Sequence, residues 1–286
     1  MSCHGIMAVM RAAASMLLVL SPSGAFAFAP VARTRSRPLA SGPLFSTATD
    51  TDASIETEKN PRLSGLALML DDGTRKSHSI AENTQFVTGF FAGLADRDSY
   101  RIYEAMEICM DTTNEERVKY LDSPQLRRLP SIRKDMDFFY AEELGSDWDK
   151  KIEPSQASKQ YVARIQEISE TKPHLLIAHQ YTRYLGDLFG GQMMGGMAAR
   201  SLDLNDGEGT EFYRFEGIES TSAFITEWYK DLNKLDLTEK QKEEIVDEAN
   251  LVFALNIAIF QEIEGSPIKA MFTLAISTLK QKLGIS

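Results

Sequence analysis

The stretch LGDLFGGQMMGGMAAR occupies residues 185–200 and decides how the rest of the chain is interpreted. Its apolar residues suit a helix, yet five of the eleven positions from Gly186 to Gly196 are glycine. An interior glycine costs a helix about 1 kcal/mol relative to alanine, so the segment gives up on the order of 5 kcal/mol locally. Gly186 and Gly190 lie one turn apart and share a face that carries no Cβ atoms. The pattern therefore predicts that this backbone closely approaches another bulky object.

Three kinds of object could meet such a face. A second helix is the first, as in Gly-xxx-Gly packing, although that device belongs mainly to membranes. A phosphate group is the second, but a phosphate-binding loop needs a Lys after its glycines and none follows here. A planar ligand over a kinked helix is the third, and it also accounts for an acidic Asp187 among the glycines. The segment alone leaves the first and third interpretations open.

Helical periodicity continues on both sides of this stretch. Apolar residues spaced by three and four predict helices over Ala81–Leu94, Gln160–Ser169 and Ile268–Leu283. A further helix begins at Thr238, where Thr238 and Gln241 have the form of a capping box. No strand-like alternation stands out, and no break is long enough to be an interdomain linker. The prediction is an all-α, multi-helix fold in a single domain.

Composition excludes several classes of protein. The 286 residues are 43% hydrophobic and 25% charged, the balance of a globular protein with a sizeable core. There are 31 Lys and Arg against 41 Asp and Glu, and this acidic excess disfavours nucleic acid as a partner. The apolar run Leu251–Phe260 is shorter than the roughly 20 residues a helix needs to span a bilayer, so no transmembrane segment is expected in the mature chain.

The amino-terminal residues have the composition of targeting signals. Residues 1–27 combine Arg11, a short apolar stretch and a small-residue end, and we expect a secretory signal peptide. Residues 28–55 contain no acidic residue before Asp50 and are rich in Arg, Ser, Thr and Pro, as in an organelle transit peptide. The pair resembles the bipartite presequences that deliver proteins to the plastid stroma of algae with red-lineage plastids, while an ordinary secreted protein is the alternative. Residues 56–286 remain for the folded domain.

Few residues could bind a metal. Without the leader only Cys109 remains, which excludes multi-cysteine sites. His174 and His179 are five apart and point away from each other on a helix, so they are expected to be ordinary structural histidines. His78 precedes an aromatic stripe and could face an apolar groove. A lone His cannot build a zinc site but can supply the one axial ligand of a haem iron, although a lone His is more often structural.

Two segments carry a specific resemblance when they are taken together. They are TRKSHSIAEN at residues 74–83 and LIAHQYTRYLGDLFGGQ at residues 176–192. In this order they resemble the haem oxygenases, and the tail from IVDEAN at 245–250 is similar to their cyanobacterial and red-plastid branch. The resemblance covers Leu63 to Lys280.

The resemblance implies that haem b lies between a proximal helix and the kinked, Gly-rich distal helix. His78 would bind the iron and Glu82 would hold the other ring nitrogen. Asp187 would act through ordered water on dioxygen at the iron, and Arg183, Tyr161 and Asn256 match positions in or near that network. The remaining implied haem contacts are Phe90, Tyr181, Gly186, Gly190, Phe253, Phe260 and Lys230. The products would be biliverdin, carbon monoxide and ferrous iron.

The implied partners are dioxygen, reduced ferredoxin as the electron donor and a downstream bilin reductase. A basic docking face for an acidic ferredoxin would comprise Arg127, Arg128, Arg133 and Lys134, and a merely solvated charged face is the alternative.

Some positions depart from the family's pattern. Asp71 stands seven residues before the His, where a basic contact to a haem propionate is expected, and Ile225 and Tyr229 replace two later basic contacts. A non-catalytic haem-binding or haem-sensing relative is therefore the alternative function.

Overall fold

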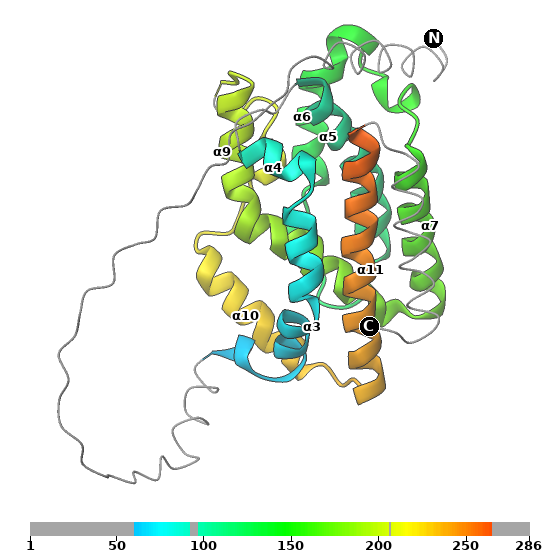
Figure 1. The fold of residues 1–286 in the computed structure, drawn as a ribbon, viewed down its shortest axis with the longest axis vertical. Helices are drawn as coiled ribbons and strands as arrows, with labels where there is room; N and C mark the ends of the chain where they lie inside the picture. Colours follow the sequence, from blue (N-terminus) through cyan, green and yellow to red (C-terminus); the bar gives the residue numbers. More distant parts are fainter. Residues whose placement is uncertain (1–59, 92–96, 206, 265–286) are drawn as a thin grey trace, which may run out of the picture. The chain divides into compact units, whose positions relative to one another are not determined.

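The computed structural model describes residues 60–91, 97–205 and 207–264, all within a compact unit, Thr57–Ser286 (Figure 1). In this part of the chain every regular element is helical, which confirms the predicted all-α class. The α-helices are α3 (Gly65–Glu82), α4 (Gln85–Phe91), α5 (Arg97–Arg117), α6 (Leu129–Leu144), α7 (Gln156–Thr171), α8 (Leu176–His179), α9 (Gln192–Ser201), α10 (Thr221–Lys234) and α11 (Glu239–Ile263). Short 3-10 turns are η1 (Pro61–Leu63), η2 (Pro124–Leu126), η3 (Trp148–Lys150), η4 (Pro173–Leu175) and η7 (Glu211–Tyr213). Two π-helical segments, η5 (Gln180–Leu185) and η6 (Asp187–Gly191), join α8 to α9.

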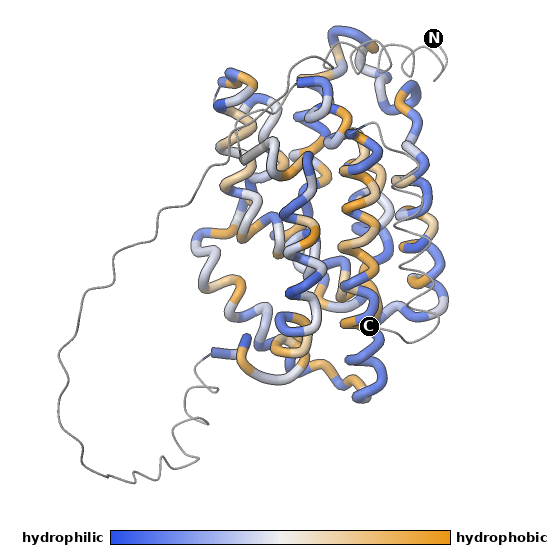
Figure 2. The backbone as a smooth tube through the Cα atoms, in the orientation of Figure 1, coloured by the Kyte–Doolittle hydropathy of each residue, from blue (hydrophilic) through white to orange (hydrophobic). Residues whose placement is uncertain are grey.

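Helix α11 is the centre of the arrangement, and α3, α5 and α7 pack against it (Figure 1). It begins at the predicted capping box: Thr238 N–H donates to Gln241 Oε1 at 2.9 Å, and Gln241 N–H donates to Thr238 Oγ1 at 3.3 Å. Figure 2 shows apolar residues along this enclosed helix and hydrophilic residues along the outer side of α7. None of the helices in the described part of the chain has the length and hydropathy of a membrane-spanning segment.

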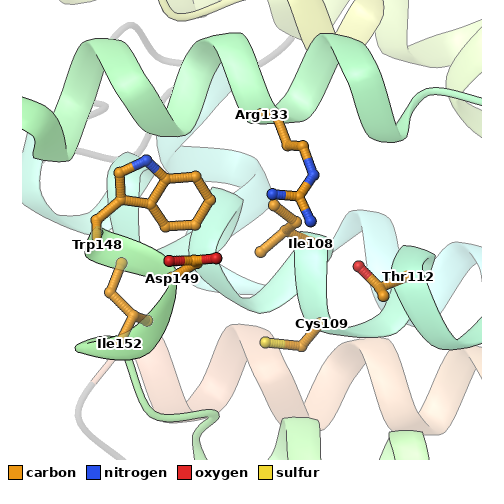
Figure 3. Close-up of a pocket in the computed structure, with 7 residues that line it drawn as sticks. All are labelled: Ile108, Cys109, Thr112, Arg133, Trp148, Asp149 and Ile152. Carbon is orange, nitrogen blue, oxygen red and sulfur yellow. The ribbon is translucent and has the colours of Figure 1, made fainter. Parts of the chain in front are cut away.

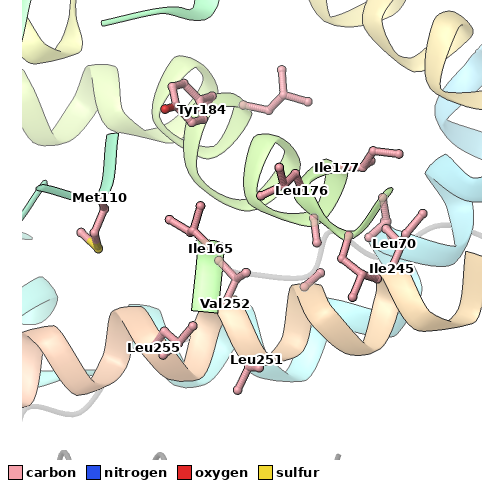
Figure 4. Close-up of a cluster of buried hydrophobic side chains, with 14 of the residues drawn as sticks. Leu70, Met110, Ile165, Leu176, Ile177, Tyr184, Ile245, Leu251, Val252 and Leu255 are labelled. Carbon is pink, nitrogen blue, oxygen red and sulfur yellow. The ribbon is translucent and has the colours of Figure 1, made fainter. Parts of the chain in front are cut away.

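The main core lies where α3, α5, α7, α8, η5 and α11 meet (Figure 4). Its buried side chains include Leu70, Met110, Ile165, Leu176, Ile177, Tyr184, Ile245 and Val252. Ile165 lies on the predicted helix 160–169, which is confirmed inside α7, and Ile245 and Val252 lie on the predicted helix from Thr238. Burying such side chains stabilises the fold by about 1.5–3 kcal/mol each before the entropy cost of ordering them.

Helix α3 approaches α11 closely at Gly73. A Cβ atom on Gly73 would overlap Val246 Cγ1, so a larger residue here would force the Val246 side chain to move. Asn250 then links the two helices, because its Nδ2 donates to the Gly73 carbonyl at 3.1 Å and its Oδ1 accepts from Ser77 Oγ at 2.5 Å. These contacts hold α3 in register with α11 one residue before His78.

The predicted helix over 81–94 is wrong at its start. Helix α3 runs on to Glu82 and a new helix, α4, begins at Gln85. The break arises because Asn83 and Thr84 turn their side chains back onto α3: Asn83 Nδ2 donates to the Ser79 carbonyl at 2.7 Å, and Thr84 Oγ1 donates to the Ala81 carbonyl at 2.9 Å. Residues 92–94 of this helix and the predicted helix over 268–283 lie outside the described residues.

Candidate functional site

His78 lies near the carboxyl end of α3 with 57% of its side chain exposed. Its ring meets the edge of the Phe253 ring of α11, with centroids 5.6 Å apart and planes at 88°. Nδ1 lies 3.5 Å from Glu82 Oε1, one turn further along α3. A carboxylate at one ring nitrogen orients the imidazole and leaves the other nitrogen, Nε2, to bind a metal.

The glycine-rich stretch forms a helix that is interrupted by π-helical turns, as a kinked distal helix requires. Segments η5 and η6 flank Gly186, and the backbone becomes α-helical again at Gln192. Such π-helical turns widen a helix locally and occur often at functional sites. The sequence did not predict the π-helical form of these turns.

The glycines divide into two groups with different surroundings. A Cβ atom added to Gly186 or Gly190 would meet nothing within 4 Å. A Cβ atom on Gly191 would lie 3.0 Å from the Tyr213 ring, and one on Gly195 would lie 2.8 Å from it. Close packing therefore explains Gly191 and Gly195, but Gly186 and Gly190 present bare backbone to open space, which suits a planar ligand.

Asp187 is held from behind by a buried charge network. Arg128 Nη1 donates to Asp187 Oδ2, and Arg128 Nε donates to Asp111 Oδ2 at 2.7 Å. Arg183 Nη2 donates to Asp111 Oδ1 at 2.5 Å and to Glu107 Oε2 at 2.6 Å. Asp187 keeps 20% of its side chain exposed, whereas the other members are almost fully buried. The network fixes the Asp187 carboxylate and leaves one edge of it accessible.

The network contains two arginines and three carboxylates, so one negative charge is in excess. Burial raises the pKa of Glu107 to about 7, against the attraction of Arg183. Burial acts in the same direction on Asp111, but Arg128 and Arg183 outweigh it and lower the pKa of that carboxyl. Glu107 is therefore the member that takes up a proton near neutral pH.

The prediction that Arg128 belongs to a basic docking face is wrong. Its side chain is fully buried, with the guanidinium 4.1 Å from the Phe212 ring centroid and 4.6 Å from that of Tyr184. Its neighbour Arg127 is exposed and pairs with Asp122. Arg128 is thus a candidate site residue, but it belongs to the buried charge network and not to the surface.

The structure brings Tyr161 and Arg183 together but directs Asn256 elsewhere. Tyr161 is fully buried, and its ring centroid lies 5.4 Å from the Arg183 guanidinium. Burial raises the pKa of the Tyr161 hydroxyl. Asn256 is half-buried on α11, and its Nδ2 donates to the carbonyl of Val252 in the same helix at 3.0 Å.

The other predicted haem contacts lie on four elements. Phe253 meets His78, and Phe260 stacks on Phe86 of α4 with centroids 5.1 Å apart. Tyr181 is half-buried on η5, and burial raises the pKa of its hydroxyl. Lys230 is half-buried on α10 and pairs with Glu227 of its own helix at 2.7 Å. Phe90 lies in α4, and its side chain is outside the described residues.

Sequence analysis missed Glu107 and Tyr213. Glu107 and Asp111 sit four residues apart on one face of α5, together with the buried Asn114, so the signal was a polar stripe at helical spacing. Tyr213 comes from η7, and its role is seen only in the folded chain, where Gly191 and Gly195 pack against its ring.

A small cavity lies away from these residues (Figure 3). It holds about 220 Å³ and is lined by residues of α5, α6 and η3 with Ile152, among them Cys109, Arg133 and Trp148. Burial raises the pKa of the Cys109 thiol to about 11, which keeps it protonated and unreactive at neutral pH. None of the predicted haem contacts lines this cavity.

The available ligand residues fit a metal ion whose other ligands come from a macrocycle such as a porphyrin. In residues 60–264, apart from 92–96 and 206, no three His, Cys, Asp or Glu side chains are grouped so as to hold a metal ion. A porphyrin iron needs a single axial His, and His78 is an exposed one with a carboxylate behind it. The fold and these residues together define an all-α protein with an exposed His on one helix and bare glycine backbone on another.

The comparisons with known proteins identify the family. The family model described as heme oxygenase matches residues 64–262, and the chain belongs to that family. It is 41% identical to heme oxygenase 1 of Nostoc sp. over 228 residues, 77% of this chain and 94% of that protein. It is also 41% identical to a heme oxygenase of Guillardia theta over 232 residues, 77% of this chain and 96% of that protein.

A solved structure agrees with these sequence relatives. The crystal structure of heme oxygenase-1 from the cyanobacterium Synechocystis sp. in complex with heme is similar, with a TM-score of 0.66 and 37% identity. The match covers 76% of this chain and 100% of that one.

Proposed function

We propose that this protein is a haem oxygenase, which cleaves haem b with dioxygen and reductant to biliverdin, carbon monoxide and ferrous iron. The observation that carries the proposal is the pairing of His78 with the open Gly186 and Gly190 backbone in a chain of this family. Bound haem supplies an iron that takes up dioxygen, and the haem is itself the molecule oxidised.

The residues on the proximal side bind the haem iron and orient the imidazole that holds it. His78 Nε2 binds the iron, Glu82 holds Nδ1, and the Phe253 ring supports the imidazole from the side. Because Asn250 fixes α3 against α11, the imidazole and its aromatic support keep their relative position.

The distal residues position water and protons. Arg128 occupies one oxygen of Asp187, so the other is left to accept a hydrogen bond from a water molecule over the haem. Glu107 is linked to this carboxylate through Arg183, Asp111 and Arg128, and a group with a pKa of about 7 can hold or release a proton at neutral pH. Tyr161 packs beside this route, with its ring against the Arg183 guanidinium.

The proposed electron donor is reduced ferredoxin. With Arg128 buried, the docking face reduces to Arg127, Arg133 and Lys134, of which Lys134 lies 3.4 Å from Glu211. The double variant Arg133→Glu with Lys134→Glu is expected to slow ferredoxin-driven turnover and flatten its salt dependence. Unchanged turnover with an unchanged salt dependence would place the donor elsewhere.

The proposed location is the plastid stroma, where the product would pass to a bilin reductase. The compositions of residues 1–27 and 28–55 support this, as does similarity to heme oxygenases of Guillardia theta and Rhodella violacea. A fluorescent protein fused after residue 55 tests it by whether it enters the plastid.

The central experiment reconstitutes residues 56–286 with haem and adds ferredoxin, its reductase and NADPH in air. A decaying Soret band with rising bilin absorption supports the enzyme. A Soret band that stays constant, and that is lost in His78→Ala, would instead identify a non-catalytic haem-binding protein. Asp187→Asn is expected to keep haem bound and lower the biliverdin yield, and an undiminished yield would contradict the role of Asp187.

A further inference from the structure

Arg62 is a cation on η1 that pairs with α3, the helix that carries His78. Its Nε donates to Asp71 Oδ1 at 3.2 Å, and its Nη2 donates to the same oxygen. Asp71 lies seven residues before His78 on α3, which places it about 10 Å along the helix axis and on nearly the same face. The ion pair therefore marks the edge of whatever ligand His78 binds.

The segment that carries Arg62 is held rigidly. Asn233 of α10 donates through Nδ2 to the Pro61 carbonyl at 2.7 Å and accepts from Ala67 N–H at 3.0 Å. Asn60 caps the turn by accepting from Arg62 N–H at 3.1 Å, and Pro61 is buried. A cation on such an anchored turn loses little conformational freedom when it binds a further partner.

An aromatic ring of α10 packs beside the guanidinium. The Tyr229 ring lies beneath it, with the centroid 6.0 Å from Arg62 Cζ. Arg62 thus lies where η1 meets α3 and α10.

The neighbouring cations are engaged differently. Arg75 pairs with Asp72 and Lys230 pairs with Glu227, each within its own helix. The Arg62 pair instead joins η1 to α3, and it uses only Nε and Nη2 of a guanidinium that has donors on Nη1 as well. Nη1 therefore remains to donate to a second carboxylate, while Asp71 already neutralises part of the charge of the guanidinium.

We propose that Arg62 binds a carboxylate of the haem at this edge, and that Asp71 limits the strength of this contact by competing for the same guanidinium. The inference rests on the proposed function, since it takes haem as the ligand of His78. It explains how a chain with Ile225 and Tyr229 on α10, and an acid at Asp71, still offers a positive charge to a dianionic porphyrin.

The test compares haem with haem dimethyl ester, whose carboxylates carry no charge. Each is titrated into the full chain and into Arg62→Gln, Asp71→Asn and the control Arg75→Gln, and the dissociation constant is read from the Soret band. Arg62→Gln is expected to weaken haem binding about tenfold and leave the ester unaffected, because a charge-assisted hydrogen bond is lost. Asp71→Asn is expected to tighten haem binding severalfold, and Arg75→Gln to change neither ligand.

Other outcomes overturn the inference. Unchanged haem affinity in Arg62→Gln, or equal weakening toward haem and its ester, would show that Arg62 contacts no haem carboxylate. Weaker haem binding in Asp71→Asn would show that Asp71 supports the site rather than competes in it. If the unaltered chain gives no Soret shift with either ligand, the proposed function fails and the inference fails with it, whereas the first two results leave the proposed function standing.

Discussion

Gly186→Ala is expected to stabilise the haem-free protein while it weakens haem binding. The new Cβ atom meets nothing within 4 Å, so no packing cost opposes the gain in helix propensity of about 0.5–1 kcal/mol. For a domain of this size that gain corresponds to a rise in Tm of roughly 1–4 °C. The same methyl group would lie between the distal backbone and the porphyrin.

Gly195→Ala is the matched control on the same distal segment. Its Cβ atom would lie 2.8 Å from Tyr213 Cδ2 and 2.9 Å from Tyr213 Cγ, which forces the ring or the helix to move. Overpacking of this kind costs about 1–3 kcal/mol and exceeds the propensity gain, so Tm falls. Haem affinity is expected to change less than in Gly186→Ala, because the strain lies on the Tyr213 side.

The assay is thermal unfolding of both variants without haem, followed by haem titration at a temperature where both are folded. Opposite shifts in Tm, with about tenfold weaker haem binding in Gly186→Ala only, would support the division of the glycines. A lower Tm for Gly186→Ala would refute the open space at Gly186. Equal haem affinity in Gly186→Ala and the unaltered protein would refute the placement of the ligand against it.

Three further predictions concern stability. Burial raises the pKa of Glu107 from 4.5 to about 7, so the folded state keeps a proton that the unfolded chain releases. Relative to Glu107→Gln, the free energy of unfolding should therefore fall by about 3 kcal/mol as the pH rises from about 4.5 to 7. A difference between the two proteins that stays constant with pH in urea titrations would contradict this. Arg128→Met leaves Asp111 and Asp187 without their shared cation. The free energy of unfolding, measured by chemical unfolding, should fall by about 3–5 kcal/mol. A fall below about 1 kcal/mol would mean that water reaches the network. Thr238→Ala removes the capping box of α11 and should cost about 1 kcal/mol, measurable as a lower Tm with unchanged haem affinity; no change in Tm would mean that the cap is redundant.

The sequence predicted the features that depend on local pattern. Helical spacing identified α7 and the start of α11, and the glycines identified the distal segment, because these signals lie within one or two turns. The helix boundary at Asn83 was missed since it depends on which carbonyls the Asn83 and Thr84 side chains reach.

Long-range packing decided what the sequence could not predict. Arg127 and Arg128 are adjacent and identical in type, yet one is exposed and the other is buried. The difference arises because Asp111 of α5 and Asp187 of η6 converge on Arg128 in the folded chain. In the same way, Gly186 and Gly195 look alike until Tyr213 is placed beside only one of them.

The close pairing of α3 with α11 bears on how this protein is made. Helix α3 leaves the ribosome early, but the surface that receives Gly73 and Ser77 is on the last described helix, more than 160 residues later. At about 5–20 residues per second, the ribosome needs on the order of ten to thirty seconds to supply it. During that interval the helix that carries His78 lacks its packing partner, and the nascent chain must wait for its carboxyl-terminal part before the His78 end of α3 is formed. In stalled or shortened translation products that lack α11, the early helices would therefore be open to chaperones and proteases, and the chain would not bind haem.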